Sequence, residues 1–290
     1  MKLNGLIKQK LRKTFTILLL ILLPIVILVV INIKPYFYYT EEDVEHLKEG
    51  MVDSALAYQN DEGLFIETSI DSNFYAITSI PFTNGVEVEA VHGDIEALIK
   101  FIWSKQTPFE GGYSDIALLG NIEDTYMVFK SIQQLNASFL NTSIYYRNFN
   151  VFGKNYAISN ENKTNYLLNF LNNSYINNSG GFAPKAYLTQ PDIQSTCLAL
   201  ELYQYYDPNW LVENNASVLN YVDSLITGNA SFGFGYRLSN ITLNPDPIST
   251  YFGLKIRSIL NSNPNASETL LFQIYLNSTQ QVDGGYASYP

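Results

Sequence analysis

Two adjacent carboxylates are the best candidates in the sequence for acid chemistry. Glu123 and Asp124 stand in the step Asn121-Ile-Glu-Asp-Thr125. Neighbouring carboxyl groups push each other's pKa values apart, which can leave one of them protonated and able to donate a proton. Acidic residues are also favoured in the first turn of a helix, because they offset the positive end of its dipole. We favour the helix start and keep acid catalysis by these residues as the alternative.

A second pair of carboxylates occupies equivalent positions in a repeat. The pattern G-[FY]-x8-P-D-x-x-S-T occurs at 181–196 and again at 235–250, 54 residues later. Its acidic members, Asp192 and Asp246, could line a cavity as a carboxylate pair for sugar chemistry. Their recurrence is better explained by two helix starts. We expect any bound ligand to contact these two carboxylates together with Tyr126 and Tyr251.

Cysteine and histidine are too sparse for a metal centre. Cys197 is the one cysteine, which excludes an intramolecular disulfide, and the two histidines, His46 and His92, lie far upstream. Zinc needs three or four well-placed N, S or O ligands. The sequence also contains no Ser/His/Asp set and no glycine pair followed by a phosphate-binding lysine. We therefore expect no metal and no cofactor.

Glycine pairs followed by an aromatic residue mark the repeating unit. They stand at 111–113, 180–182 and 284–286, with the variant G-F-G-Y at 233–236. Apolar residues at helical spacing precede two of these steps, at 95–103 and 218–226. We expect each glycine step to end one helix, and each Pro-Asp step to start the next with proline in its first turn. Because strand alternation is weak, the sequence predicts an all-α domain of stacked helix pairs.

These repeats resemble the prenyltransferase and squalene-oxidase repeat family. Its units have the form Q-x-x-D-G-G-[FWY]…[ST]-T-[YC], which is similar to the segments at 280–286 and 195–197. The resemblance covers residues 50–290 and implies an α/α-toroid of alternating inner and outer helices. Family members include protein prenyltransferase β subunits, class II terpenoid cyclases and the thioester domains of complement-like proteins. The fold alone does not imply one of these chemistries.

The residues that carry those chemistries in the family are largely missing here. The zinc-binding D-x-C step has Ser195 in place of its aspartate, and the position of the later histidine holds Ser249. The acid motif of the cyclases, D-x-D-D-T, has only the echo N-x-E-D-T at 121–125, and no C-G-E-Q thioester step occurs. The resemblance therefore implies the architecture and leaves catalysis in doubt.

An uncharged apolar run near the N-terminus predicts a membrane anchor. Residues 15–33 have the length of a transmembrane helix, and the preceding tail, 1–14, contains basic residues and no acidic one. The positive-inside rule places that tail in the cytoplasm and everything after Lys34 outside, as a linker at 34–45 and a domain at 46–290. A cleaved signal peptide and a buried core helix are the alternatives. The chain stops four residues past Tyr286, where a further inner helix is due, so we expect an open ring or a continuing sequence.

Charge and glycosylation motifs agree with an external domain. All 27 acidic residues follow the anchor, so this part of the chain is a poor partner for nucleic acid. The predicted outer side also holds every N-x-[ST] acceptor, more of them than chance explains, although an Asn-rich loop composition is the alternative. The acceptors are Asn136, Asn141, Asn162, Asn172, Asn177, Asn215, Asn229, Asn240, Asn265 and Asn277.

Together these features predict a membrane-anchored, extracytoplasmic glycoprotein with a toroid domain. We interpret it as a non-catalytic binding or scaffolding module for a glycan, lipid or protein ligand. The alternative is an enzyme, either of the terpenoid cyclase and prenyltransferase type or a carboxylate-based glycan-processing enzyme. Convergence of the inner-helix carboxylates in one pocket with an apolar wall would favour the enzyme.

Overall fold

The computed structural model describes most of the C-terminal part of the chain. The described residues are 69–79, 95–107, 110–115, 119–136, 147–151, 154–158, 163–229, 231–281 and 286–287. The chain divides into two compact units, Met1–Glu49 and Gly50–Pro290, and all described residues lie in the second. The predicted anchor at 15–33, the linker at 34–45 and both histidines lie outside them. Among the described helices, none combines the length and apolar content that a membrane crossing needs.

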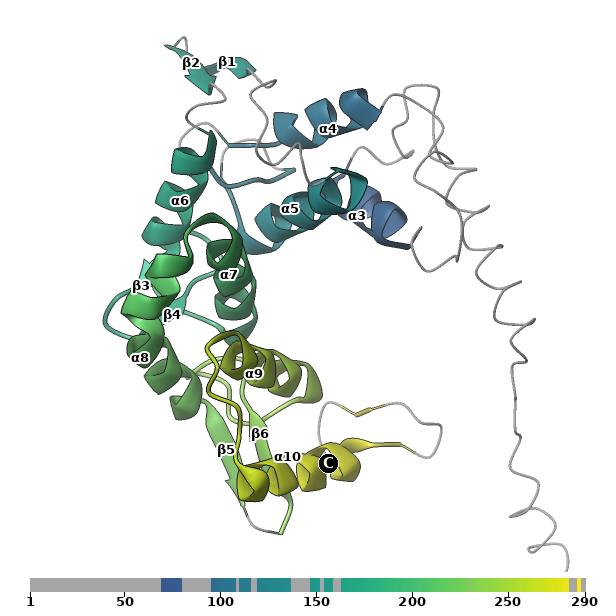
Figure 1. Ribbon diagram of the computed structural model, residues 1–290, viewed down its shortest axis with the longest axis vertical. Coiled ribbons are helices and arrows are strands. Elements are labelled where there is room, and N and C mark those ends of the chain that lie inside the picture. The colour runs from purple at the N-terminus through teal and green to yellow at the C-terminus, as the bar shows by residue number, and fades with distance from the viewer. Residues whose placement is uncertain are drawn as a thin grey trace, which may run out of the picture. The chain divides into compact units, whose positions relative to one another are not determined.

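Helices in two alternating rows make up most of the described chain, in agreement with the helix-on-helix prediction (Figure 1). The first row, which we call the inner row, consists of the helices α3 (Ile70–Ser79), α5 (Ile122–Asn136), α7 (Ile193–Tyr206) and α9 (Pro247–Ile259). The second row, which we call the outer row, consists of the helices α4 (Ile95–Ser104), α6 (Lys163–Ser174), α8 (Pro208–Ser224) and α10 (Ala266–Thr279). Within the inner row α5 packs between α3 and α7, and α7 packs against α9. Each of α4, α6 and α8 contacts an inner helix.

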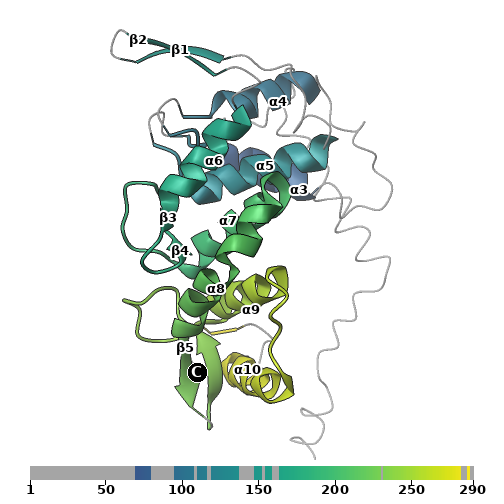
Figure 2. The same ribbon diagram turned by 60° about the vertical axis from the view of Figure 1, so that its left-hand side comes forward.

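Three short antiparallel hairpins accompany these helices among the described residues. They pair β1 (Arg147–Val151) with β2 (Lys154–Ile158), β3 (Tyr175–Ile176) with β4 (Gly181–Phe182), and β5 (Ile226–Asn229) with β6 (Gly233–Tyr236). Figure 2 shows β5 and β6 beside α10, which packs on β6. The last two hairpins contain the glycine steps of the repeat, so they recur with the repeat.

In the three glycine steps that the structure describes, the first glycine lies directly on the backbone of an outer helix. A Cβ at Gly180 would lie 2.2 Å from the carbonyl oxygen of Ser217 in α8, and the glycine has a φ of +83°, which side chains disfavour. Gly111 and Gly233 make the same approach to Tyr166 in α6 and Leu271 in α10. The expectation that these glycines end helices is wrong, because α6 stops at Ser174, well before Gly180. The glycines allow close packing of the next outer helix instead.

In these three steps the second glycine lies against an aromatic ring one helical turn further along the same outer helix. A Cβ at these positions would come within 2.9, 2.5 or 2.7 Å of ring atoms. The pairs are Gly112 with Phe170, Gly181 with Tyr221, and Gly235 with Tyr275. All three rings are among the largest fully buried side chains, so these contacts lie in the core between the rows.

A buried threonine joins each of these three glycine steps to the inner helix that follows it. The Thr196 hydroxyl oxygen accepts from the backbone N–H of Phe182 at 3.0 Å and donates to the carbonyl of Asp192 at 2.6 Å. Thr125 and Thr250 repeat both bonds, to Tyr113 and Asn121 in one copy and to Tyr236 and Asp246 in the other. We call this pair of bonds the threonine clasp. It closes the loop between the glycine step and the inner helix in all three copies.

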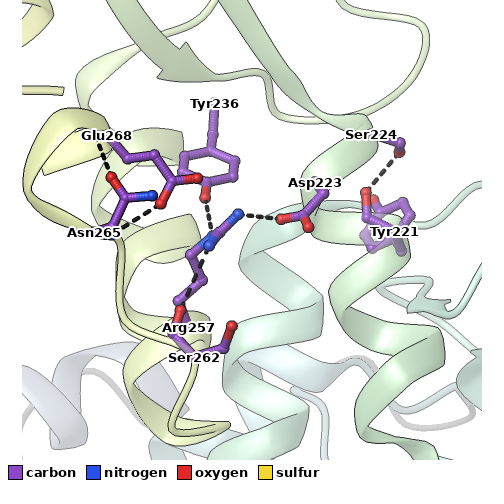
Figure 3. Close-up of polar contacts among 8 residues, drawn as sticks. All are labelled: Tyr221, Asp223, Ser224, Tyr236, Arg257, Ser262, Asn265 and Glu268. Carbon is purple, nitrogen blue, oxygen red and sulfur yellow. Dashed lines mark hydrogen bonds and ion pairs between the residues drawn. The ribbon is translucent and has the colours of Figure 1, made fainter. Parts of the chain in front are cut away.

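Backbone and side-chain bonds then link neighbouring units. The first amides of α5 and α7, at Ile122 and Ile193, donate to carbonyls in the following unit's loop at 2.9 and 2.8 Å. Near α10, the buried Arg257 side chain of α9 donates from Nε to the Tyr236 hydroxyl at 2.7 Å and pairs with Asp223 of α8 (Figure 3). Because one guanidinium bonds to α8 and β6 at once, it fixes α9 between them.

Candidate functional site

Asn121 is the residue that caps α5. Its side-chain oxygen accepts from the backbone N–H of Asp124 at 2.7 Å, and its Nδ2 donates to the Asp124 carboxylate at 2.6 Å. Glu123 and Asp124 both lie in the first turn of the helix. The predicted helix start with both acidic residues in its first turn is therefore confirmed, and the asparagine before them, a typical N-cap residue, caps the helix.

Asp124 is held in a partly desolvated position. Burial raises its pKa to about 6, against an opposing hydrogen bond from Asn121, and the charges of Asp71 and Asp115 raise it further. Burial disfavours the charged form of a carboxyl group, and nearby negative charge adds to the effect. Asp124 therefore keeps its proton to a higher pH than an ordinary aspartate does, a property that favours a proton donor.

Glu123 and Asp192 meet at a polar pocket of about 290 Å³ between the starts of α5 and α7. Gln194 donates to the Glu123 carboxylate across this pocket at 3.4 Å. Burial raises the pKa of Glu123, and the charges of Asp71 and Asp192 add to the shift. The lining consists of Asn121, Glu123, Pro184, Lys185, Asp192, Gln194, Ser195, Leu198 and Leu238. We call it the α5/α7 pocket; neither Asp124 nor Asp246 lines it.

The two repeated aspartates are occupied by their own helices. Asp192 is the N-cap of α7, where one carboxylate oxygen accepts from the Ser195 backbone at 2.6 Å and the other from its hydroxyl at 2.8 Å. Asp246 caps α9 through Ser249 in the same way, at 2.8 and 2.5 Å. Pro191 and Pro245 precede these caps and lie outside the helices, so the expectation that the proline of each Pro-Asp step lies in the first turn is wrong; in α9 the first turn holds Pro247 instead. Asp192 lines the α5/α7 pocket, and Asp246 does not.

A charged network that sequence reasoning missed joins three inner helices. Glu201 of α7 pairs with Lys255 of α9 and with Lys130 of α5, whose Nζ lies 3.4 Å from the carboxylate. The Tyr126 hydroxyl donates to the same carboxylate at 3.0 Å. Tyr251, which the sequence grouped with Tyr126, is 56 % exposed, and Lys255 lies 5.6 Å from its ring centroid. The three charged residues carry a net charge of +1, and each of their charges has a partner.

Cys197 has the properties of a core residue. Its side chain is 0 % exposed, and burial raises the pKa of the thiol to about 12. A metal-binding cysteine requires the thiolate form, which this environment opposes. Ser195, at the aspartate position of the family's D-x-C step, donates its hydroxyl to Asp192. Over the residues that the structure describes, no three His, Cys, Asp or Glu side chains are placed to hold a metal.

Comparison with known proteins identifies the family. The sequence matches the prenyltransferase alpha-alpha toroid domain over residues 117–290, and the chain belongs to this family. Among solved structures it is similar to a Candida albicans protein geranylgeranyltransferase-I complexed with GGPP, at 17 % sequence identity and a TM-score of 0.44. That similarity covers 71 % of this chain and 56 % of the other, so this chain spans little more than half of it. No curated protein matches the sequence.

The raised pKa of Asp124 predicts a pH-dependent effect of Asp124→Asn. Because the folded state holds the proton more tightly than an ordinary aspartate with a pKa of 3.8, ionisation between pH 4 and about 6 destabilises the fold. The Asn variant cannot ionise, so above pH 7 it should be more stable than the parent by on the order of 1 kcal/mol, after allowance for partial exposure. The gain should vanish near pH 4. Urea unfolding at both pH values measures it.

Glu213→Gln, at an exposed position on α8, is the matched control and should show no such gain. An Asp124→Asn variant that is less stable than the parent above pH 7 would contradict this prediction. In that case the hydrogen bond from Asn121 stabilises the charged carboxylate more than burial opposes it, and the pKa of Asp124 is not raised.

Proposed function

We propose that this chain is a non-catalytic binding module, held outside the cytoplasm by the predicted helix at 15–33. Its ligand docks in the α5/α7 pocket. The proposal rests on the hydrogen bonds of the two repeated carboxylates. In Asp192 and in Asp246, both carboxylate oxygens accept hydrogen bonds from the serine three residues later. Helix caps of this kind stabilise the fold and leave no free carboxylate pair for glycan cleavage.

The inner row supports the same conclusion through its charged network. Glu201 is bonded to Lys130, Lys255 and Tyr126, so its carboxylate is fully engaged, and both ammonium groups are held by ion pairs with it. Burial of charged groups is tolerated when they are paired in this way. A charged network on α5, α7 and α9 also provides a poor wall for an isoprenoid chain, which requires apolar lining.

The charge of the α5/α7 pocket favours a basic ligand group. Glu123 is exposed at its mouth and Asp192 lies within it, while Lys185 is its one positive side chain. Burial is the main cause of the raised pKa of Glu123, and the negative charges of Asp71 and Asp192 add to it; a cation placed in the pocket offsets those two charges. The ligand that fits best is a protein segment presenting a lysine or arginine, with Asn121 and Gln194 as hydrogen-bonding neighbours.

Exposure of the glycosylation motifs is consistent with an external position. Asn172, Asn177, Asn229, Asn240, Asn265 and Asn277 are exposed. Asn215 is half-buried and donates from its side chain to the Leu260 carbonyl at 3.3 Å, which makes it the poorest acceptor of these. Asn141 and Asn162 lie outside the described residues, as does the side chain of Asn136.

Binding of a basic peptide tests the proposed ligand site. The probe is a capped tetralysine peptide, compared with the same peptide acetylated on every lysine, against the full chain in detergent. Glu123→Gln should weaken tetralysine binding about fivefold, because one pocket charge is lost at a partly exposed position. Glu213→Gln is the control for the general attraction of an acidic protein. Equal binding of both peptides, or equal losses in both variants, would contradict the site.

Topology is tested separately on intact cells that express the full chain. Protease added outside should cleave the chain beyond about residue 40, since the basic tail at 1–14 predicts a cytoplasmic N-terminus. A tag placed before residue 14 should stay protected until the membrane is permeabilised. The opposite pattern of protection, or cleavage at both ends, would rule out the proposed orientation.

Acid catalysis is the second candidate, favoured by the pKa of Asp124 at about 6. In this case Asp124 donates a proton to an alkene or a leaving group, and Asp124→Asn abolishes turnover while the fold remains stable. Assays with isoprenoid and glycan substrates distinguish the two functions. We expect no turnover by the parent chain.

A further inference from the structure

Exposed apolar side chains lie close in sequence to the lining of the α5/α7 pocket. The segment before α5 supplies Asn121 to the lining, and the loop before α7 supplies Pro184 and Lys185, while Leu238 comes from the loop before α9. Each of these three segments also exposes a large apolar side chain within three residues of the lining. We call these residues the apolar collar: Leu119 is 42 % exposed, Tyr187 54 %, Leu188 37 % and Leu238 39 %. One such residue is ordinary on a protein surface, but several around one polar pocket are typical of an interaction site.

Backbone hydrogen bonds hold two of these loops against the starts of α5 and α7. The Pro184 carbonyl accepts from the Ile122 amide at 2.9 Å, and the Leu238 carbonyl accepts from the Ile193 amide at 2.8 Å. Ile122 and Ile193 each stand between two residues that line the pocket. The loops are therefore bonded to the same helix starts that form the pocket.

Tight turns then follow the lining residues of both loops. The Leu188 amide donates to the Lys185 carbonyl at 3.0 Å. In the loop before α9, the Ser239 amide donates to the Thr242 hydroxyl at 3.0 Å, and the Thr242 amide donates to the Ser239 carbonyl at 3.2 Å. A surface that is already ordered loses less entropy when a partner binds, so this part of the collar is prepared for docking.

The pocket and its collar select different parts of a ligand. The charged residues of the lining are Glu123, Asp192 and Lys185, with a net charge of −1, and the collar adds no charge. A small cation satisfies the pocket but leaves the collar in water. A purely apolar ligand covers the collar but places no cation beside the carboxylates. A ligand with a basic group between apolar groups satisfies both.

We propose that the partner of the α5/α7 pocket is an extended protein segment in which one lysine or arginine is flanked by apolar residues two positions before and after it. This inference rests on the proposed function of the pocket. In an extended chain, side chains at i and i±2 point to the same face. When the basic side chain enters the pocket, the apolar side chains meet the collar on the α5 side, near Leu119, and on the α7 side, near Leu238.

Two capped peptides of equal length and charge, L-S-K-S-L and S-S-K-S-S, separate the collar from the pocket. The full-length chain is made in a host that adds no glycans and is held at one chain per nanodisc of zwitterionic lipid, with empty discs as background. Fluorescence anisotropy of peptides labelled at the N-terminus measures affinity. The parent should bind L-S-K-S-L about tenfold more tightly, because two leucine side chains become partly buried.

Variants of the collar and of the pocket should have different effects. Tyr187→Ser combined with Leu238→Ser should abolish the tenfold preference and leave S-S-K-S-S binding unchanged. Glu123→Gln should weaken both peptides equally, about fivefold, because both place a lysine in the pocket. Val212→Ser, at an exposed apolar position on α8, is the matched control and should change neither affinity.

The two sets of variants distinguish failure of this inference from failure of the proposed function. Equal binding of both peptides by the parent, or a leucine preference that survives the collar variant, overturns the inference, and the pocket still stands if Glu123→Gln weakens both peptides. If Glu123→Gln weakens neither peptide, the proposed function of the pocket is wrong and the inference is overturned with it.

A dye on the collar tests whether the lipid surface covers it instead of a protein segment. Cys197 is the one cysteine of the chain and is fully buried, so Tyr187→Cys provides a single accessible thiol for an environment-sensitive dye. Its emission should shift to shorter wavelength when L-S-K-S-L is added, and not when S-S-K-S-S is added. Emission that is already shifted in nanodiscs before any peptide is added, relative to the same dye on Val212→Cys, means that the bilayer covers the collar and overturns the inference.

Discussion

The threonine clasp is the interaction on which the rest of the structure depends. In each of three units, one buried hydroxyl accepts from the amide of the aromatic residue and donates to the carbonyl of the N-cap residue. A buried backbone group without a partner destabilises a fold substantially, so the clasp fixes the loop between glycine step and inner helix. Because that loop is fixed, the two glycines pack against the outer helix. The side chain of the N-cap residue accepts a hydrogen bond from the first turn of the inner helix.

This arrangement explains why residues that could do chemistry serve the fold instead. The clasp positions Asp192 and Asp246 as N-caps, so their carboxylates bond to Ser195 and Ser249 rather than to each other. On the faces between inner helices, Glu201 is balanced by lysines of the two neighbouring helices. The surfaces that remain for ligands are therefore the pockets where loops meet, and these differ from unit to unit while the clasp does not.

Local and repeated features were predictable from the sequence, and contacts between distant side chains were not. The apolar spacing at 95–103 predicted α4, and the Pro-Asp steps predicted the starts of α7 and α9. The glycine contacts were misjudged, since nothing near Gly180 in the sequence identifies Ser217 as its neighbour. The sequence gives no signal for the Glu201 network, because its partners Lys130 and Lys255 are 71 and 54 residues away. The burial of Asp124 also depends on packing, because an acidic residue in a helix's first turn is ordinarily solvated.

The clasp hydroxyl holds each unit together, and substitutions at Thr196 test this dependence most directly. Thr196→Val keeps the shape but removes the hydroxyl, leaving the Phe182 amide and the Asp192 carbonyl without this partner, whereas Thr196→Ser keeps the hydroxyl and loses one methyl group. From denaturant unfolding we predict a loss of about 2–4 kcal/mol for valine, against about 1 kcal/mol for serine. Amide hydrogen exchange at Phe182 should accelerate only in the valine variant. A valine variant as stable as the serine variant, with Phe182 still protected, would contradict the account.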